Sequence, residues 1–180
     1  MRADIETVSS QLVYQNKWLR VREDIVRRRD DSQGIYGVVE RRDFVIVAPL
    51  QDGRLTLVEQ YRYPVRARLW ELPMGMWPDD SAVAAEVLAE AELREETGYR
   101  AREMTRVGTV LMGPGFCDQT GHLFLATGLI PGRAEREATE QDMRARDFTL
   151  AEVMAMVADG TLCDGMTLAA LGLLRLKGLI

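Results

Sequence analysis

Partial alternation of apolar and polar positions marks the N-terminal part of the chain. Three runs, Gln11–Tyr14, Leu19–Val26 and Gly34–Glu40, contain β-branched and aromatic residues in the way that is typical of strands. The polar segment 29–34 joins the second run to the third and predicts a hairpin turn. The pattern therefore predicts a first domain of antiparallel strands over residues 1–41.

The pattern changes where a nearly continuous apolar run begins. Phe44–Leu50 shows no alternation, so we expect this strand to be buried on both faces of a sheet. The polar segment 51–54 predicts a tight turn into a partner strand, Leu55–Arg62. Two further strands are predicted near Thr105–Met112 and His122–Ala126.

A helix is predicted in the middle of the chain. It is expected to begin at a capping residue within 79–81 and to end near Thr97, because Gly98 is a good residue to follow a helix. Its inward stripe is predicted to consist of Ala85, Leu88, Ala89 and Leu93.

Two more helices are predicted at the C-terminal end. The segment Asp147–Leu150 leads into a helix at 151–158, and a last helix at 166–177 is expected to start from Asp164 or Thr167. Strands, a helix, strands and then helices form the order of an α+β domain. Residues 42–180 are accordingly predicted to be one domain.

Composition limits the classes of partner. Of the 180 residues 47% are hydrophobic and 28% charged, which is ordinary for a soluble globular protein. The net charge of −5 argues against a nucleic-acid partner.

Two cysteines are too few for a disulfide framework and indicate a reducing compartment. Neither a signal peptide nor a membrane helix of about 20 apolar residues is predicted, so we expect a cytoplasmic protein without membrane partners.

Three carboxylates lie close together on the predicted central helix. Glu92 is three residues before Glu95 and four before Glu96, so the three side chains share one helical face. Their mutual repulsion favours a bound cation, and a hard ion such as Mg²⁺, with Mn²⁺ as the alternative, takes oxygen ligands. The same run is also typical of a solvated helix, because glutamate is a good helix former.

The residues around these carboxylates resemble the signature of the Nudix hydrolases. The segment Glu92–Tyr99, with Leu72–Gly75 upstream, is similar to the second half of that signature. Two positions depart from it: Ala91 stands where the family has an arginine, and Val83 stands where the family has an earlier glutamate. The spacing from Gly75 to Glu92 is also two residues longer than in the family. The missing arginine normally orients one of the glutamates.

Two other segments resemble the ADP-ribose pyrophosphatase-like branch of that family. Glu59–Pro64 is similar to the segment in which an arginine meets the substrate, and this resemblance assigns Arg62 to a diphosphate contact. A surface arginine at a strand end is the alternative. The loop 113–121 resembles a Pro-Gly-Phe-Ser-Asp-Glu loop of the branch, with cysteine and glutamine in place of the serine and the final glutamate. The resemblance also implies that Glu71 and Phe116 bind substrate.

The resemblance further implies a metal ligand and a general base outside the central helix. The backbone carbonyl of Met74 is expected to add to the metal ligands Glu92, Glu95 and Glu96, of which the last two are also assigned to catalysis. The base is expected in the polar loop 129–141, where Glu140 is the first choice and Glu137 the second. A solvated loop without a catalytic role is the alternative.

The family resemblance implies an α/β/α sandwich with a mixed sheet, preceded by N-terminal antiparallel strands. It also implies Mg²⁺-dependent hydrolysis of a nucleoside diphosphate linked to another group, with ADP-ribose or a related nucleotide sugar as the small-molecule substrate. Ala91, Gln119 and the lengthened loop favour the alternative, a non-catalytic or weakly catalytic nucleotide-diphosphate binder. The apolar residues of the N-terminal strands predict a homodimer.

Overall fold

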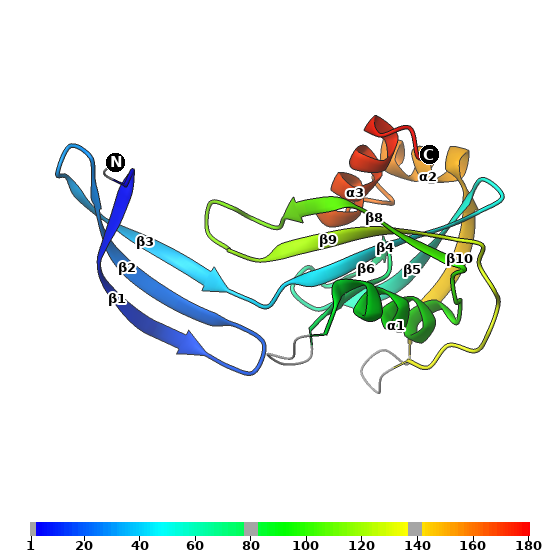
Figure 1. Cartoon of the computed structure of the whole chain (residues 1–180), viewed down its shortest axis with the longest axis horizontal. Coiled ribbons are helices and arrows are strands. Elements are labelled where there is room, and N and C mark those ends of the chain that lie inside the picture. The colour runs from blue at the N-terminus through cyan, green and yellow to red at the C-terminus, as the bar shows by residue number, and fades with distance from the viewer. Residues whose placement is uncertain (1–2, 78–82, 137–141) are drawn as a thin grey trace. The chain divides into compact units, whose positions relative to one another are not determined.

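The computed structural model describes residues 3–77, 83–136 and 142–180 and divides into two compact units. One unit comprises Met1–Asp43 and Leu111–Thr120, and the other comprises Phe44–Val110 and Gly121–Ile180. The segment Leu111–Thr120, which the sequence pattern assigned to the second domain, thus belongs to the first unit. Figure 1 shows the course of both parts of the chain.

The first unit is built on a three-stranded antiparallel sheet. Its strands pair in the order β1-β2-β3, with β1 at Ile5–Gln15, β2 at Arg20–Arg28 and β3 at Gln33–Glu40. The first strand begins six residues before the predicted run, because Ile5 and Glu6 pair with the charged end of β2 and the polar Thr7 and Ser9 pair with Val26 and Ile25. Two register shifts interrupt the pairing of β1 with β2.

The second unit contains a seven-stranded mixed sheet in the order β10-β5-β4-β9-β8, with β6 paired to β5 and β7 paired to β4. The pairing of β4 with β9 is parallel, and the pairings of β5, β6, β7 and β10 are antiparallel. The strands are β4 (Phe44–Gln51), β5 (Arg54–Arg62), β6 (Ala67–Glu71), β7 (Met74–Met76), β8 (Glu103–Leu111), β9 (Thr120–Thr127) and β10 (Arg144–Thr149).

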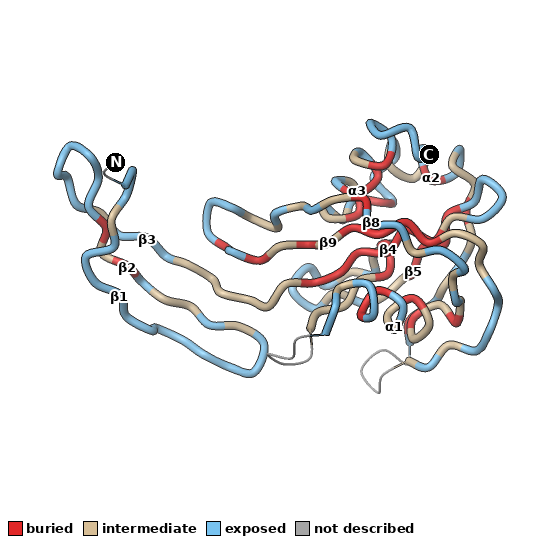
Figure 2. The backbone as a smooth tube through the Cα atoms, viewed as in Figure 1, coloured by how far each residue is buried: buried red, intermediate tan, exposed pale blue. Residues whose placement is uncertain are grey.

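Helices cover both faces of this sheet. In Figure 1, α1 (Ala85–Thr97) lies on one face, and α2 (Leu150–Asp159) and α3 (Gly165–Leu176) lie on the other. The predicted α/β/α sandwich of the α+β class is thereby confirmed. Figure 2 shows burial concentrated on the central strands. The core beneath α1 contains Val45, Val47, Leu88, Ala89, Leu93, Phe124 and Ala126.

The helix boundaries correct the predicted capping residue of α1 and agree with the predicted start of α2 to within one residue. Ala84 is the N-cap of α1 and provides no side-chain cap, so the described helix begins after the expected capping residues 79–81, which lie outside the described residues. The helix α2 begins at Leu150 because Thr149 and Glu152 form a capping box, in which the Glu152 amide donates to Thr149 Oγ1 at 3.2 Å. The segment before it is strand β10, which the sequence pattern did not predict.

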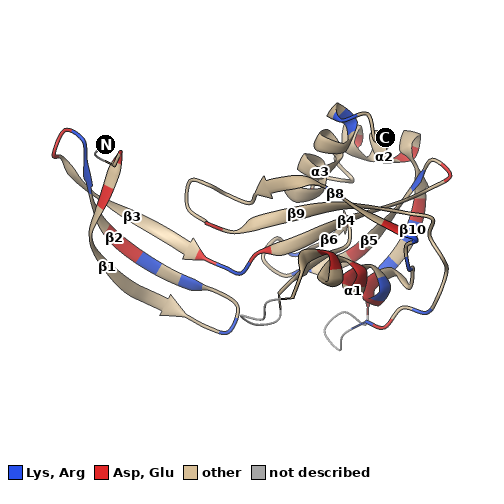
Figure 3. Cartoon of the chain, viewed as in Figure 1, with Lys and Arg blue, Asp and Glu red and all other residues tan. Residues whose placement is uncertain are grey.

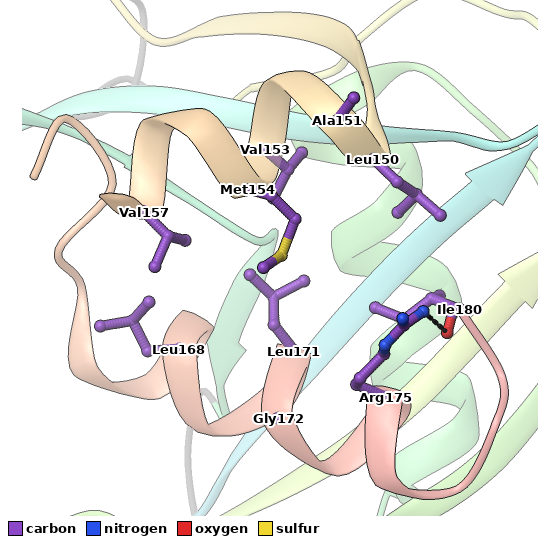
Figure 4. A pocket seen from close by; sticks show the side chains of 10 residues that line it. All are labelled: Leu150, Ala151, Val153, Met154, Val157, Leu168, Leu171, Gly172, Arg175 and Ile180. Carbon is purple, nitrogen blue, oxygen red and sulfur yellow. Dashed lines mark hydrogen bonds between the residues drawn. The ribbon is translucent and has the colours of Figure 1, made fainter. Parts of the chain in front are cut away.

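An apolar cavity of about 380 Å³ lies between α2 and α3 (Figure 4). At one end, Arg175 Nη1 donates a hydrogen bond to the Ile180 carbonyl oxygen at 3.1 Å. Met154, on the α2 side of the cavity, is 65% exposed.

Across the described ranges, no helix combines the length and apolar character needed to cross a bilayer.

Candidate active site

The three predicted carboxylates lie on the last two turns of α1. Glu96 is fully buried at 0% exposure, whereas Glu92 and Glu95 are partly buried. The helix ends at Gly98, which has a left-handed φ of 80° and donates its amide to the Arg94 carbonyl at 2.9 Å. The predicted end of the helix is therefore confirmed. The carboxylates lie just before the residue at which the chain leaves the helix.

A glycine on β7 makes room for Glu92. A Cβ atom placed on Gly75 would lie 1.8 Å from both Cδ and Oε1 of Glu92, so no other residue fits here without moving that carboxylate. Gly75 itself is held by pairing opposite Val45 of the central strand β4. Met74, whose carbonyl was predicted as a metal ligand, is the preceding residue of β7. The structure thus brings β7 and the Glu92 carboxylate into direct contact.

Arg62 and Glu71 form a bidentate ion pair between neighbouring strands. Arg62 Nε donates to both Glu71 carboxylate oxygens, at 2.8 and 3.1 Å, and Nη2 donates to Oε2. The Glu71 side chain is 2% exposed and that of Arg62 42% exposed. Arg62 is the last residue of β5 and is paired with a buried carboxylate. The structure joins these two predicted substrate contacts to each other.

The charges around Arg62 extend beyond this pair. Its pKa is raised above the ordinary value, first by the hydrogen bonds to Glu71 and then by the negative charges of Glu71, Glu96 and Asp164, while burial acts in the opposite direction. Asp164 caps α3 by accepting the Thr167 amide at 2.7 Å. One cation is thus surrounded by carboxylates from β6, α1 and the start of α3. Figure 3 shows the acidic residues gathered along α1.

Carboxylate oxygens are the ligands that a hard divalent cation prefers, and the three carboxylates of α1 lie on one face of the helix. The space that Gly75 leaves for Glu92 places one of them against β7, and the burial of Glu96 places another in the interior. In the part of the chain that the structure describes, however, no three His, Cys, Asp or Glu side chains already converge as a metal centre. A metal would therefore require rotation of these side chains toward one point.

The remaining predicted site residues are Phe116, Glu140 and Glu137. Phe116 belongs to the first unit, is 55% exposed and covers Gly113. In the same loop, the Gln119 amide donates to the Arg42 carbonyl at 2.6 Å, so it fastens the loop to the end of the N-terminal segment. Glu140 and Glu137, the first and second choices for the base, lie outside the described residues.

The sequence reasoning missed contacts that connect distant segments. Thr167 is fully buried, and its Oγ1 accepts the Leu72 amide at 2.9 Å, which ties the residue after Glu71 to the first turn of α3. Asp164 was one of two predicted starts of the last helix, and the structure selects it. Its place among the carboxylates around Arg62 follows from packing between segments far apart in the sequence, for which the sequence carries no local signal.

Comparison with known proteins shows which family the chain resembles. The family model described as the nucleoside diphosphate sugar hydrolase N-terminal domain matches residues 5–39. The ADP-ribose pyrophosphatase of Mycobacterium tuberculosis is 33% identical over 168 residues, which cover 92% of this chain and 81% of that protein. The ADP-ribose pyrophosphatase of Bacillus subtilis is 31% identical and covers 73% of this chain and 71% of its own length.

A solved structure shows the same fold. The crystal structure of an ADP compounds hydrolase superposes with a TM-score of 0.86 at 20% identity, covering 98% of this chain and 96% of that one. Together these similarities define a pyrophosphohydrolase, an enzyme class that cleaves nucleoside diphosphates linked to another group. The chain belongs to the Nudix hydrolase superfamily, in its ADP-ribose pyrophosphatase-like branch. Enzymes of this family generally use a divalent metal ion, and the predicted resemblance is confirmed.

Proposed function

We propose that this enzyme hydrolyses the diphosphate of ADP-ribose or of a related nucleotide sugar, with Mg²⁺ as its metal and Mn²⁺ as the alternative ion. The names of the two similar pyrophosphatases support this choice of substrate. The observation that carries the metal assignment is the Glu92 carboxylate seated against Gly75, one helical turn from the buried Glu96. Glu92, Glu95, Glu96 and the carbonyl of Met74 would hold the ion.

When bound, the metal would neutralise the diphosphate and lower the pKa of a coordinated water. The protein's own contribution begins with Arg62. Its Nε and Nη2 are bonded to Glu71, and a guanidinium has five N–H donors, so further donors are available to phosphate oxygens. Glu71 fixes the plane of the guanidinium, which orients those donors. We therefore assign Arg62 to the diphosphate and Glu71 to holding Arg62.

A general base is also required to take a proton from the attacking water. The amide of Gln119 does not accept a proton near neutral pH, and it is bonded to Arg42. The α1 carboxylates are assigned to the metal. We therefore propose Glu140 as the base, with Glu137 as the second choice, and Phe116 as a contact for the nucleotide.

A substrate panel tests the reaction. Purified protein is incubated with Mg²⁺ and with ADP-ribose, ADP-glucose or GDP-mannose, and release of the nucleoside monophosphate and the sugar phosphate is followed. Water adds to one phosphorus while the bridging P–O bond breaks, so ADP-ribose yields AMP and ribose 5-phosphate. We expect the largest kcat/KM for ADP-ribose. Binding of these compounds without hydrolysis, with either Mg²⁺ or Mn²⁺, would instead support the non-catalytic binder.

We also propose that two copies associate through the N-terminal sheet. Large apolar residues on its strands are strongly exposed, with Val13 at 61%, Tyr14 at 55% and Ile35 at 65%. Sheet edges and exposed apolar side chains favour association with another chain. Sedimentation at micromolar concentration tests this proposal: a dimer is expected, and a monomer would contradict it.

The state of the cysteines supports a reducing, cytoplasmic location, which we also propose. Cys117 and Cys163 are both free thiols, the first buried and the second exposed. An exposed thiol persists unpaired where the surroundings keep it reduced. Fractionation of cells that express the tagged protein, with marker enzymes for each compartment, tests this location.

A further inference from the structure

Residues 130–136, here called the strap, cross the C-terminal end of α1 within the second unit. At the start of the strap, Ile130 exchanges two backbone hydrogen bonds with Arg100, at 2.8 and 3.0 Å. Near its end, the Glu135 amide donates to the carbonyl of Glu95 at 3.0 Å. The strap is thus bonded at one end to the chain that leaves α1 and at the other end to α1 itself.

The strap supplies hydrogen-bond donors where the helix has none. The last four carbonyls of an α-helix lack partners within the helix. Glu95 and Glu96 provide two of these carbonyls, and they accept from the Glu135 amide and from Arg136 Nε, the latter at 3.2 Å. The guanidinium of Arg136 also brings a positive charge to the negative end of the helix dipole. Both bonded carbonyls belong to residues that we assign to the metal.

The backbones of the strap and of the helix end are in direct contact. A Cβ atom on Gly98 would lie 2.8 Å from both the Ala134 nitrogen and the Gly132 oxygen, and one on Gly132 would lie 2.7 Å from the Gly98 oxygen. Glycine at both positions allows this close approach. An ion pair between Arg94 Nε and Glu135 Oε2, at 3.5 Å, adds a side-chain contact.

We propose that the strap fixes the last turn of α1, and that Arg136 is a positioning residue which holds the backbone at Glu96, so that the side chains of Glu95 and Glu96 can turn together toward one metal ion. This inference rests on the proposed function, in which those glutamates bind Mg²⁺. A helix end without partners for its carbonyls opens readily, and its side chains then lose their common direction. Bonds from the strap to the carbonyls of Glu95 and Glu96 oppose that opening directly.

Substitution of Arg136 tests the positioning role. Removal of a residue that orients metal ligands typically costs 10–100-fold in metal affinity or activity. We expect Arg136→Ala to weaken Mg²⁺ binding, measured by calorimetry, and to lower kcat by about 10–100-fold, with KM changed by less than about threefold. Amide hydrogen exchange over residues 94–97 should become faster. Arg136→Lys keeps a charged donor and should restore most of both properties.

The matched control is Arg133→Ala. Arg133 lies in the same strap, and its guanidinium makes no hydrogen bond or ion pair among residues 3–77, 83–136 and 142–180. This variant changes the net charge by the same amount as Arg136→Ala. We expect Mg²⁺ affinity, kcat and hydrogen exchange to remain as in the wild type.

A second pair of variants tests the backbone bond. Glu135→Pro removes the amide that donates to Glu95, whereas Glu135→Ala keeps that amide and removes only the carboxylate. We expect the proline variant to reproduce the Arg136→Ala losses and the alanine variant to stay close to wild type. An active wild type with unchanged Mg²⁺ affinity in both Arg136→Ala and Glu135→Pro overturns the role of the strap. A wild type that neither binds Mg²⁺ nor hydrolyses any substrate overturns the proposed function, and the positioning role with it.

Discussion

In the N-terminal sheet, Leu12 and Ile35 are 47% and 65% exposed, whereas Leu55 and Leu57 on β5 of the second unit are completely buried. The difference arises from the layers around each sheet. In the second unit, helices cover both faces of the sheet, and the described part of the first unit contains strands and turns alone. Apolar strand residues therefore form a core in one unit and a surface in the other. The same residue type supports folding in the second unit and the proposed association in the first.

Each unit nevertheless buries a carboxylate beside an arginine. Asp24 on β2 is 3% exposed and accepts from Arg22, as Glu71 accepts from Arg62 in the second unit. The surroundings of the two pairs differ. Arg22 also forms an ion pair with Glu40 in its own sheet, with 2.8 Å between Nε and Oε1, whereas Arg62 lies near further carboxylates of α1 and α3. The buried pair of the second unit thus lies among the carboxylates proposed for the metal, whereas that of the first unit is paired within its own sheet.

The largest expected effect follows from substitution of the proposed general base, Glu140. Loss of a general base typically lowers the rate by 10²–10⁴-fold, so Glu140→Gln should reduce kcat by at least about 10²-fold with little change in substrate affinity. Steady-state kinetics and substrate titration measure the two quantities. The sedimentation behaviour should remain that of the wild type. A loss under about threefold, with Glu137→Gln equally mild, would show that neither residue is the base.

Substitution of the proposed metal ligands should have the next largest effect on activity. Glu95→Gln and Glu96→Gln are each expected to weaken Mg²⁺ binding and to depress turnover, because an amide oxygen is a poorer ligand for a hard cation than a carboxylate. Stability should be unchanged or slightly raised, since one like charge leaves the helix face. Glu90→Gln, at an exposed position of the same helix, is the control. Unaltered Mg²⁺ titrations in both variants would exclude these residues as ligands.

The same substitution in the two units should have unequal effects on stability. Leu57→Ala empties a completely buried site on β5 and should cost about 2–5 kcal/mol in the free energy of unfolding. Leu12→Ala changes a half-exposed position and should cost less than about 1 kcal/mol, while it weakens the dimer. Urea denaturation and sedimentation measure these two outcomes. Equal destabilisation by both variants would break the distinction between core and surface.

The smallest expected effect is a loss of folding stability at alkaline pH. Burial raises the pKa of the Tyr99 hydroxyl above its ordinary value of 10.0, and the charge and hydrogen bond of Asp147 act in the same direction. Between pH 10.0 and the folded pKa the unfolded chain loses this proton while the folded chain keeps it, so stability should fall as pH rises. Denaturation midpoints at pH 8 and above pH 10 measure this slope. Tyr99→Phe should flatten it, whereas Tyr63→Phe, at a 78% exposed position, should not.

Local patterns predicted the parts of the site that lie within one element. The spacing of Glu92, Glu95 and Glu96, the helix end at Gly98 and the start of α3 at Asp164 are all properties of short segments. The ion pair between Arg62 and Glu71 could not be read in the same way, because it depends on how β5 and β6 pair. The strand β10 was missed for a related reason: its charged residues find cross-strand partners, such as Glu59 opposite Arg144, that the sequence does not reveal.

The parallel pairing of β4 with β9 has a consequence for the order in which the chain folds during synthesis. Residues Phe44 to Pro49 find their parallel partners only at Gly121 to Ala126. Long-range pairing of this kind is slow to form, whereas the neighbouring strands β1, β2 and β3 pair through short local turns. The N-terminal sheet can therefore form as it leaves the ribosome. One apolar edge of β4 remains unpaired until β9 has been synthesised. Because an unpaired apolar strand edge is prone to aggregation, we expect the newly made chain to be most vulnerable during that interval.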